Sequence, residues 1–161
     1  MPLPPTERIW PTATGKAMFS VFKGVHENVV VEGEDVMRLV TLRSHDQYNT
    51  TIYAMDDRYR GVFGRRDVLF MNEQDMAAQG LEHGDRVDIH TALPDSELTL
   101  EDITVVAYGI APGTVGAYYP EANVLVPLNY LDEESGTPSY KSVPVRLTLR
   151  SKEIRPLAGG R

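Results

Sequence analysis

The sequence predicts a mainly β fold, a closed barrel or sandwich of short strands with one or two short helices. Short strand-like runs rich in β-branched and aliphatic residues alternate with turns that contain Gly or Pro. A convincing helical pattern occurs once, between Asn72 and Gly80. No segment repeats at a fixed period. At 161 residues the chain is long enough for one domain with a real core.

The first 35 residues are expected to hold little regular structure. Met1–Pro11 carries four prolines and reads as an irregular lead-in, which extends to residue 16. A short strand is predicted at Ala17–Phe22, where apolar and polar residues alternate. The acidic stretch Gly24–Asp35 is predicted as loop, with a brief strand at Val29–Val31.

The central stretch joins two predicted strands through a long polar loop. Val36–Leu42 and Val68–Met71 are the strands, since both are rich in aliphatic residues. The loop begins RSHDQYNTT at Arg43, and its side chains can bond either local backbone or a ligand. A rigid strand that ends in a loop of hydrogen-bonding groups is a common way to present a binding site.

The second half continues the pattern of strands and turns around one helix. Asn72 is a suitable N-cap for a helix over Glu73–Gln79, and Gly80 suits the left-handed position that ends it. Further strands are predicted at Arg86–Thr91, Leu98–Tyr108 with a bulge at Glu101-Asp102, Val115–Tyr119, Val124–Leu128 and Val143–Leu149. The domain is therefore placed at residues 17–150, and residues 151–161 are expected to form a disordered tail.

Charge is distributed unevenly. The net charge of −7 argues against a general nucleic-acid surface or an anionic-membrane surface. Between Arg43 and Arg66, however, five arginines stand against three aspartates, a formal charge of +2. A locally basic loop on an acidic protein favours a small anionic ligand. Arg–Asp pairing on a solvated face is an equally open interpretation.

The residue types present exclude several kinds of catalytic and metal-binding site. The chain has no cysteine, which excludes disulfides, cysteine-held iron–sulfur clusters and cysteine nucleophiles, and fits a cytoplasmic location. No apolar run has the length of a membrane span, and no signal-peptide core begins the chain. The four histidines lack metal-site spacing, and consecutive Ser44, His45 and Asp46 cannot form a catalytic relay. We therefore predict no catalytic residue and no metal ligand.

Four segments together resemble the C-terminal dinucleotide-binding domain of molybdopterin oxidoreductases. They read TATGKAMF, LVTLRSHDQYNTT, FMNEQDMAAQGLEHGDRVDI and NVLVPLNYLDEESGTPSYKSVPVRL. More narrowly, SHDQYNTTIYAMDDRYRG is similar to the formate-dehydrogenase-like alpha-subunit branch of that family. The resemblance covers Thr12 to about Leu149, nearly the whole chain.

The resemblance implies a fold and a role. The fold is a double-psi β-barrel (aspartate-decarboxylase-like) that caps bis-molybdopterin guanine dinucleotide, with molybdenum or tungsten as the metal. Preceding domains of the same parent chain hold most of the cofactor and carry the redox chemistry. Residues 1–16 then correspond to the lead-in from such a domain. No enzymatic turnover is expected from this chain alone.

The resemblance also implies a set of cofactor contacts in the loop after the first long strand, at the Asn of NVL and at the Lys of PSYK. The predicted cofactor-binding residues are Thr41, Arg43, Ser44, His45, Asp46, Gln47, Tyr48, Asn49, Thr50, Tyr119, Asn123, Tyr140 and Lys141. By chemistry alone, Arg43 is the most obvious phosphate partner. We expect Arg43–Thr50, Asn123 and Lys141 to converge on one exposed, polar face, where Arg43 and Lys141 repel each other.

Two other functions fit the same predicted barrel. A stand-alone barrel that binds peptide or protein partners is one, because a fold does not fix a function. The other is a self-processing decarboxylase of similar shape, which is made by cleavage at a Gly-Ser bond. No Gly-Ser occurs in this chain, so that reading is set aside.

Overall fold

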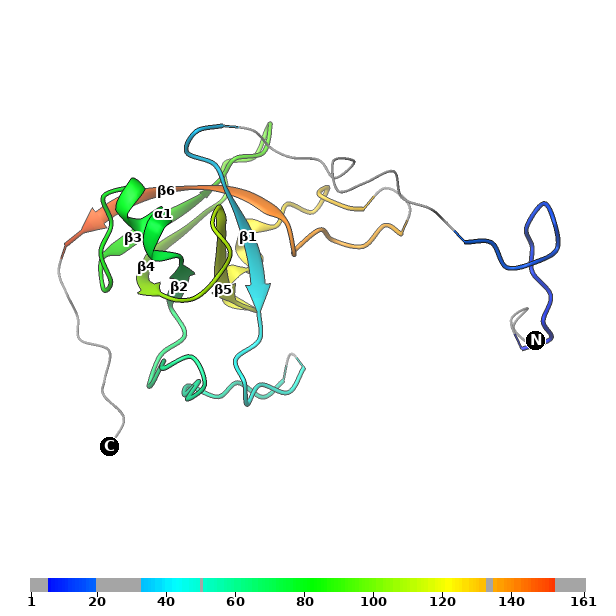
Figure 1. Cartoon of the computed structure of the whole chain (residues 1–161), viewed down its shortest axis with the longest axis horizontal. Coiled ribbons are helices and arrows are strands. Elements are labelled where there is room, and N and C mark those ends of the chain that lie inside the picture. Colours follow the sequence, from blue (N-terminus) through cyan, green and yellow to red (C-terminus); the bar gives the residue numbers. More distant parts are fainter. Residues whose placement is uncertain (1–5, 20–32, 50, 133–134, 153–161) are drawn as a thin grey trace. The chain divides into compact units, whose positions relative to one another are not determined.

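The computed structural model describes residues 6–19, 33–49, 51–132 and 135–152 (Figure 1). The chain divides into two compact units, Met1–Val30 and Val31–Arg161. In the first unit the described residues form turns, such as the one in which Gly15 donates to the Thr12 carbonyl at 3.0 Å. The strand predicted at Ala17–Phe22 is absent over Ala17–Phe19. Its remaining residues and the predicted strand Val29–Val31 lie outside the described residues.

The second unit contains a closed barrel of six strands, which run in the order β1-β5-β2-β4-β3-β6 around it (Figure 1). The strands are β1 (Met37–Leu42), β2 (Val68–Met71), β3 (Arg86–Thr91), β4 (Thr99–Ala107), β5 (Thr114–Tyr118) and β6 (Val143–Ser151). The β1–β5 and β2–β4 pairs are parallel, and the other four pairs are antiparallel. The predicted mainly β double-psi barrel class is confirmed.

One α-helix and one 3-10 helix accompany the barrel in the described part of the chain. The α-helix α1 (Glu73–Ala78) begins as predicted, with the Asn72 side chain accepting from the Gln74 amide at 2.9 Å. The 3-10 helix η2 (Glu121–Leu125) overlaps the strand predicted at Val124–Leu128, and that prediction is wrong. Ala122 and Leu125, three residues apart, are both fully buried, which matches the three-residue period of a 3-10 turn.

Two details of the sheet concern predicted boundaries. The predicted bulge is present. The register between β3 and β4 shifts, so that two residues of β4, Glu101 and Asp102, lie opposite a single residue of β3, Asp88. Asp102 adopts a φ of 60° there. Strand β6 runs to Ser151 because it keeps pairing with β3, so it takes in the first residue of the predicted tail. Residues 153–161 of that tail are not described.

Side chains of β2 pack into two separate hydrophobic clusters. Leu69 and Met71 point into the main core of the barrel, while Val68 and Phe70 point outward. A strand is normally exposed on its outer face, yet all four residues of β2 are buried. The outer face is covered by the loop between β1 and β2, residues 43–67, which contributes Val62 to the second cluster. The long polar loop is thus packed against the barrel.

The second cluster contains one buried acid. The Tyr118 hydroxyl donates to Asp57 Oδ2 at 2.9 Å, and Arg60 Nη1 donates to the same oxygen at 2.5 Å. Asp57 is only 1% exposed. Burial alone raises the pKa of Asp57, but the hydrogen bonds from Arg60 and Tyr118 outweigh it and hold the pKa below its ordinary value. The ionised carboxylate is therefore the form that the fold stabilises.

Replacing Asp57→Asn should lower the free energy of unfolding by about 2 kcal/mol near neutral pH, because Arg60 and Tyr118 lose a charged acceptor. A depressed folded-state pKa stabilises the fold above the unfolded pKa of about 4. That stabilisation is lost as the pH falls through the folded pKa. Urea unfolding of both proteins between pH 2 and 7 tests this prediction. The difference between their free energies of unfolding should have its full value above about pH 4 and become smaller below it.

The matched control is Asp95→Asn, which changes an exposed aspartate at a turn. It should leave the free energy of unfolding within about 0.5 kcal/mol of the original chain at every pH. A difference for Asp57→Asn that does not vary with pH would show that the carboxylate charge is not what stabilises the loop.

Candidate functional site

The pairing of β1 brings three distant segments to one end of the barrel. Because β1 is parallel to β5 and antiparallel to β6, its C-terminal end lies beside the end of β5 and the start of β6. The pairing continues past the strands. The Thr41 amide donates to the Tyr140 carbonyl at 3.2 Å, and the Tyr119 amide donates to the Leu42 carbonyl at 2.7 Å. The last residues of β1 therefore lie between Tyr119 and Tyr140.

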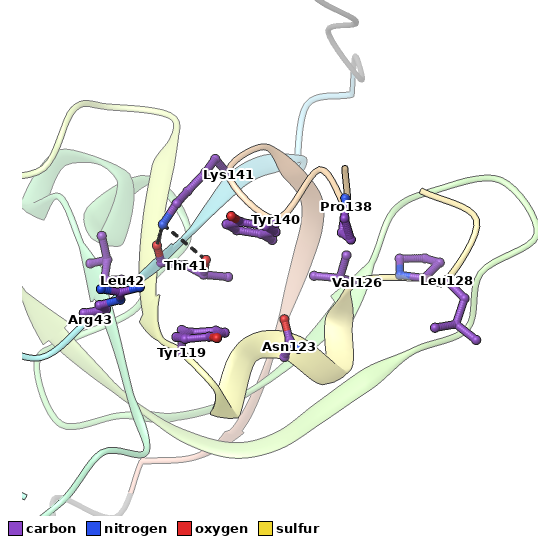
Figure 2. A pocket seen from close by; sticks show the side chains of 11 residues that line it. Thr41, Leu42, Arg43, Tyr119, Asn123, Val126, Leu128, Pro138, Tyr140 and Lys141 are labelled. Carbon is purple, nitrogen blue, oxygen red and sulfur yellow. Dashed lines mark hydrogen bonds between the residues drawn. The ribbon is translucent and has the colours of Figure 1, made fainter. Parts of the chain in front are cut away.

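These segments surround a pocket of about 550 Å³ (Figure 2), a volume within the range usual for small-molecule sites. Six of the predicted site residues line it: Thr41, Arg43, Tyr119, Asn123, Tyr140 and Lys141. The remaining wall is apolar and consists of Leu42, Val126, Pro127, Leu128 and Pro138. Sequence positions up to 100 apart thus meet in one concave site, as expected for Arg43, Asn123 and Lys141.

Two aromatic rings and one amide face this pocket. Figure 2 shows the rings of Tyr119 and Tyr140 on opposite sides of it, with the Asn123 side chain directed toward the space between them. Asn123 is exposed, and it belongs to the 3-10 helix η2. Ring faces stack on flat aromatic groups, and an amide can both donate to and accept from the edge of a heterocycle. This part of the pocket suits a planar, polar ring system.

Cationic groups occupy the other side of the pocket. Lys141 Nζ donates to the Thr41 carbonyl and lies 3.4 Å from Thr41 Oγ1 (Figure 2). Partial burial of the ammonium, together with the positive charge of Arg43, lowers the pKa of Lys141. Arg43 is exposed and forms no ion pair with any residue that the structure describes. Two neighbouring cations give this side of the pocket a positive charge, which attracts anions.

Other residues of the predicted loop lie outside the pocket lining. His45, Asp46, Tyr48 and Asn49 are exposed, and Thr50 lies outside the described residues. The His45 ring packs on Tyr59, with centroids 3.7 Å apart. Asp46 lies 3.6 Å from Arg58, so its carboxylate neutralises Arg58 rather than Arg43.

Ser44 and Gln47 correct the expectation that this loop is exposed throughout. Both are buried, at 3% and 9% exposure. Ser44 Oγ and Gln47 Oε1 accept hydrogen bonds from the buried guanidinium of Arg66, at 2.7 and 3.0 Å. Because a buried cation needs acceptors, these two side chains turn inward.

Most arginines of the loop form ion pairs with carboxylates of the same chain. The pairs are Arg58 with Asp46, Arg60 with Asp57, Arg65 with Asp67, and Arg66 with Glu121. The interpretation of Arg–Asp pairing on a solvated face holds for Arg58 and Asp46, which are both exposed. Arg60 and Arg65 also pair with aspartates but in less exposed positions, and the buried Arg66 pairs with a glutamate instead. Arg43 is the exception, and it is the arginine that lines the pocket.

Sequence reasoning missed the apolar wall and the groups that support the site. Val126 and Leu128 were assigned to a strand, whereas Val126 is the C-cap of the 3-10 helix η2 and both residues line the pocket. The signal that could have revealed the turn is the pair Pro120 and Pro127, which flank η2. Arg66 and Glu121 are 55 positions apart, and no local pattern announces their contact.

Two kinds of feature are absent from the described residues. These residues hold no group of three or more His, Cys, Asp or Glu side chains placed to bind a metal ion. None of their helices is long and apolar enough to cross a membrane.

Known proteins are similar to this chain in sequence. Residues 37–144 match the family model described as "Molydopterin dinucleotide binding domain". Protein YdeP of Escherichia coli (strain K12) is 44% identical over 144 residues, covering 88% of this chain and 19% of that protein. The "uncharacterized oxidoreductase Rv2900c" of Mycobacterium tuberculosis (strain ATCC 25618 / H37Rv) is 47% identical over 153 residues, which cover 91% of this chain and 19% of that protein. The chain thus spans about a fifth of the length of these relatives.

The matched region includes five of the six strands in full, the helix η2 and the whole pocket lining. The chain therefore belongs to the molybdopterin dinucleotide-binding domain family.

Proposed function

We propose that the pocket binds a heterocycle and a phosphate of bis-molybdopterin guanine dinucleotide, and that this domain closes over the cofactor. The observation that carries the proposal is the convergence of two tyrosine rings, one amide and two cations on a single pocket of a domain in this family. Two other pockets differ from it: one, at residues 95–98 and 123–128, has neither a tyrosine nor a cation in its lining, and the other, at residues 72–74 and 107–109, has one tyrosine and no cation.

The chemistry of the side chains fits the parts of such a cofactor. Its pterin and guanine rings are flat and edged with donors and acceptors, which suit the faces of Tyr119 and Tyr140 and the amide of Asn123. Its phosphates are anionic, which suits Lys141 and Arg43. Partial burial and the charge of Arg43 lower the pKa of Lys141, and an anion between the two cations offsets their repulsion.

The remaining chemistry is assigned to other domains. The relatives are about five times as long as the matched region, and Rv2900c carries the name of an oxidoreductase. We place the chain in a formate-dehydrogenase-like oxidoreductase, as its cofactor-capping domain. When bound, the cofactor supplies the molybdenum or tungsten that exchanges electrons with substrate. Residues of this chain bind and orient one side of it.

The closed barrel argues against the peptide-binding alternative. Peptides commonly dock by adding a strand to an open sheet edge. Each of the six strands already pairs with two neighbours, so the barrel offers no such edge.

Guanosine monophosphate should bind this pocket at millimolar concentration. In a titration followed by NMR, amide shifts are expected at Tyr119, Asn123, Tyr140 and Lys141. Tyr140→Ala should weaken binding about tenfold, because stacking of a base on an aromatic ring contributes about 1–3 kcal/mol. Ribose 5-phosphate, which lacks the ring, should bind the variant and the original chain equally.

The control is Tyr48→Ala, which removes an exposed tyrosine outside the pocket lining and should leave binding unchanged. Shifts confined to other faces of the barrel, or equal affinity of Tyr140→Ala and the original chain, would contradict the proposed site.

Arg43→Gln should raise the pKa of Lys141 toward its ordinary value near 10.4, because a neighbouring positive charge disfavours the ammonium form. A saturating anion in the pocket should raise it as well. The pKa can be followed through the ¹³Cε shift of Lys141. Since the folded-state pKa lies below the unfolded one, stability increases as the pH rises between those two values.

Arg58→Gln is the matched control, since Arg58 pairs with Asp46 and does not line the pocket. Its substitution should leave the Lys141 titration unchanged. An unaltered Lys141 pKa in Arg43→Gln would show that Arg43 does not act on the pocket.

A further inference from the structure

The guanidinium of Arg66 lies buried between two segments that are far apart in the sequence. Arg66 is 6% exposed and stands two residues before β2. One of the neighbouring segments follows β1 and includes Ser44 and Gln47. The other follows β5 and includes Tyr119 and Glu121. Both segments continue into the walls of the pocket.

On the first side, Arg66 holds the loop after β1 at three points. Nη1 donates to Ser44 Oγ at 2.7 Å and to the Ala54 carbonyl at 3.2 Å. Nη2 donates to Gln47 Oε1 at 3.0 Å. Ser44 directly follows Arg43, which lines the pocket. The backbone that carries Arg43 is thereby fixed at its next residue.

On the second side, Arg66 holds the chain around η2. Nη2 donates to the Tyr119 carbonyl at 2.9 Å. The guanidinium also donates to both carboxylate oxygens of Glu121, from Nε at 2.6 Å and from Nη2 at 3.2 Å. Gln47 Nε2 donates to the same Tyr119 carbonyl at 2.9 Å, which ties the two segments directly. Glu121 stands two residues before Asn123 in the same 3-10 helix.

Aromatic rings fix the orientation of the guanidinium. Its central carbon lies 4.9 Å from the centroid of the Tyr118 ring and 5.2 Å from that of Tyr53. A planar, five-donor group in this setting has one orientation in which all its acceptors are satisfied. A lysine ammonium cannot reproduce that pattern.

Such an arrangement is costly if stability is its only purpose. Removing an arginine from water carries a large desolvation penalty, and apolar side chains of similar volume often stabilise a fold as well or better. What a many-donor buried guanidinium adds is a fixed geometry between the segments that it joins. Here those segments are the two walls of the pocket.

We propose that Arg66, with Glu121 as its carboxylate partner, is a positioning residue that sets the separation of the Arg43 wall from the Tyr119–Asn123 wall. Arg66 does not line the pocket and acts through the residues it holds. The proposal rests on the proposed function, since the pocket is taken as the cofactor site. Fixing both walls before binding avoids the entropic cost of ordering them around the ligand.

The test compares Arg66→Lys and Glu121→Gln with the original 161-residue chain, and uses Arg65→Gln as the matched control. Arg65 is the adjacent arginine and pairs with Asp67, away from the pocket. We expect Arg66→Lys to keep the barrel, seen as an unchanged far-ultraviolet circular dichroism spectrum. The affinity for guanosine monophosphate should fall about tenfold, and Arg65→Gln should retain it.

A second readout needs no ligand. Nuclear Overhauser contacts between Gln47 and Tyr119 report the separation of the walls, and the Lys141 titration reports how near Arg43 lies. In Arg66→Lys the contacts should weaken and the Lys141 pKa should rise. Glu121→Gln, which keeps the shape of a half-exposed side chain, should show the same changes to a smaller extent.

The outcomes separate the two proposals. Wall contacts that weaken in both variants, while the original chain fails to bind guanosine monophosphate, support the positioning role and reject the proposed ligand. Unchanged contacts, Lys141 titration and affinity in both variants would overturn the positioning role and leave the ligand proposal standing. If Arg66→Lys does not fold, Glu121→Gln decides: unchanged wall contacts there would also overturn the proposal.

Discussion

The double pairing of β1 is the constraint on which the site depends. This strand is parallel to β5 on one side and antiparallel to β6 on the other. Parallel neighbours end at the same end of a barrel, and an antiparallel neighbour begins where they end. The end of β1, the end of β5 and the start of β6 therefore share one end of the barrel. Thr41, Tyr119 and Lys141 are therefore neighbours by topology, and the loops need only to refine their positions.

Burial of arginine explains how a long polar loop becomes part of a rigid frame. The 43–67 loop covers the outer face of β2 and would bury its own polar backbone at a cost if nothing satisfied it. The buried Arg66 donates to the Ala54 carbonyl at 3.2 Å, and the half-buried Arg60 donates to the exposed Arg43 carbonyl at 3.1 Å. Each guanidinium also has a carboxylate partner, Asp57 or Glu121. The two arginines thus serve as the internal scaffold of the loop.

Because most arginines of the loop are paired with carboxylates, two other cations supply the positive charge of the pocket. With Arg58, Arg60, Arg65 and Arg66 paired to carboxylates, the positive field at the site comes from Arg43 and Lys141. Arg43 is exposed, and the ammonium of Lys141 is only partly buried against Thr41. Both remain free to change partner when an anion arrives. A packed support beneath exposed charged side chains suits the binding of an anionic ligand.

The sequence by itself determined the class of fold and most of its strands. Val68–Met71 and Arg86–Thr91 were predicted with their observed bounds, because a run of apolar or alternating residues between turn signals is a local property. The Asn72 cap and the bulge at Glu101-Asp102 are local as well. The resemblance to a known family gave the predicted set of site residues, and six of these line one pocket.

Only the tertiary structure decided which polar residues face the pocket and which face inward. Ser44 and Gln47 look as available for a ligand as Arg43 does in the sequence, yet they are turned to Arg66, which comes about 20 residues later. Val124–Leu128 reads as a strand, but its first two residues belong to the 3-10 helix η2, in which Ala122 and Leu125 pack into the core formed by distant strands. A local pattern records the propensity of a segment. The partner of a buried charge is set by the fold that brings the two together.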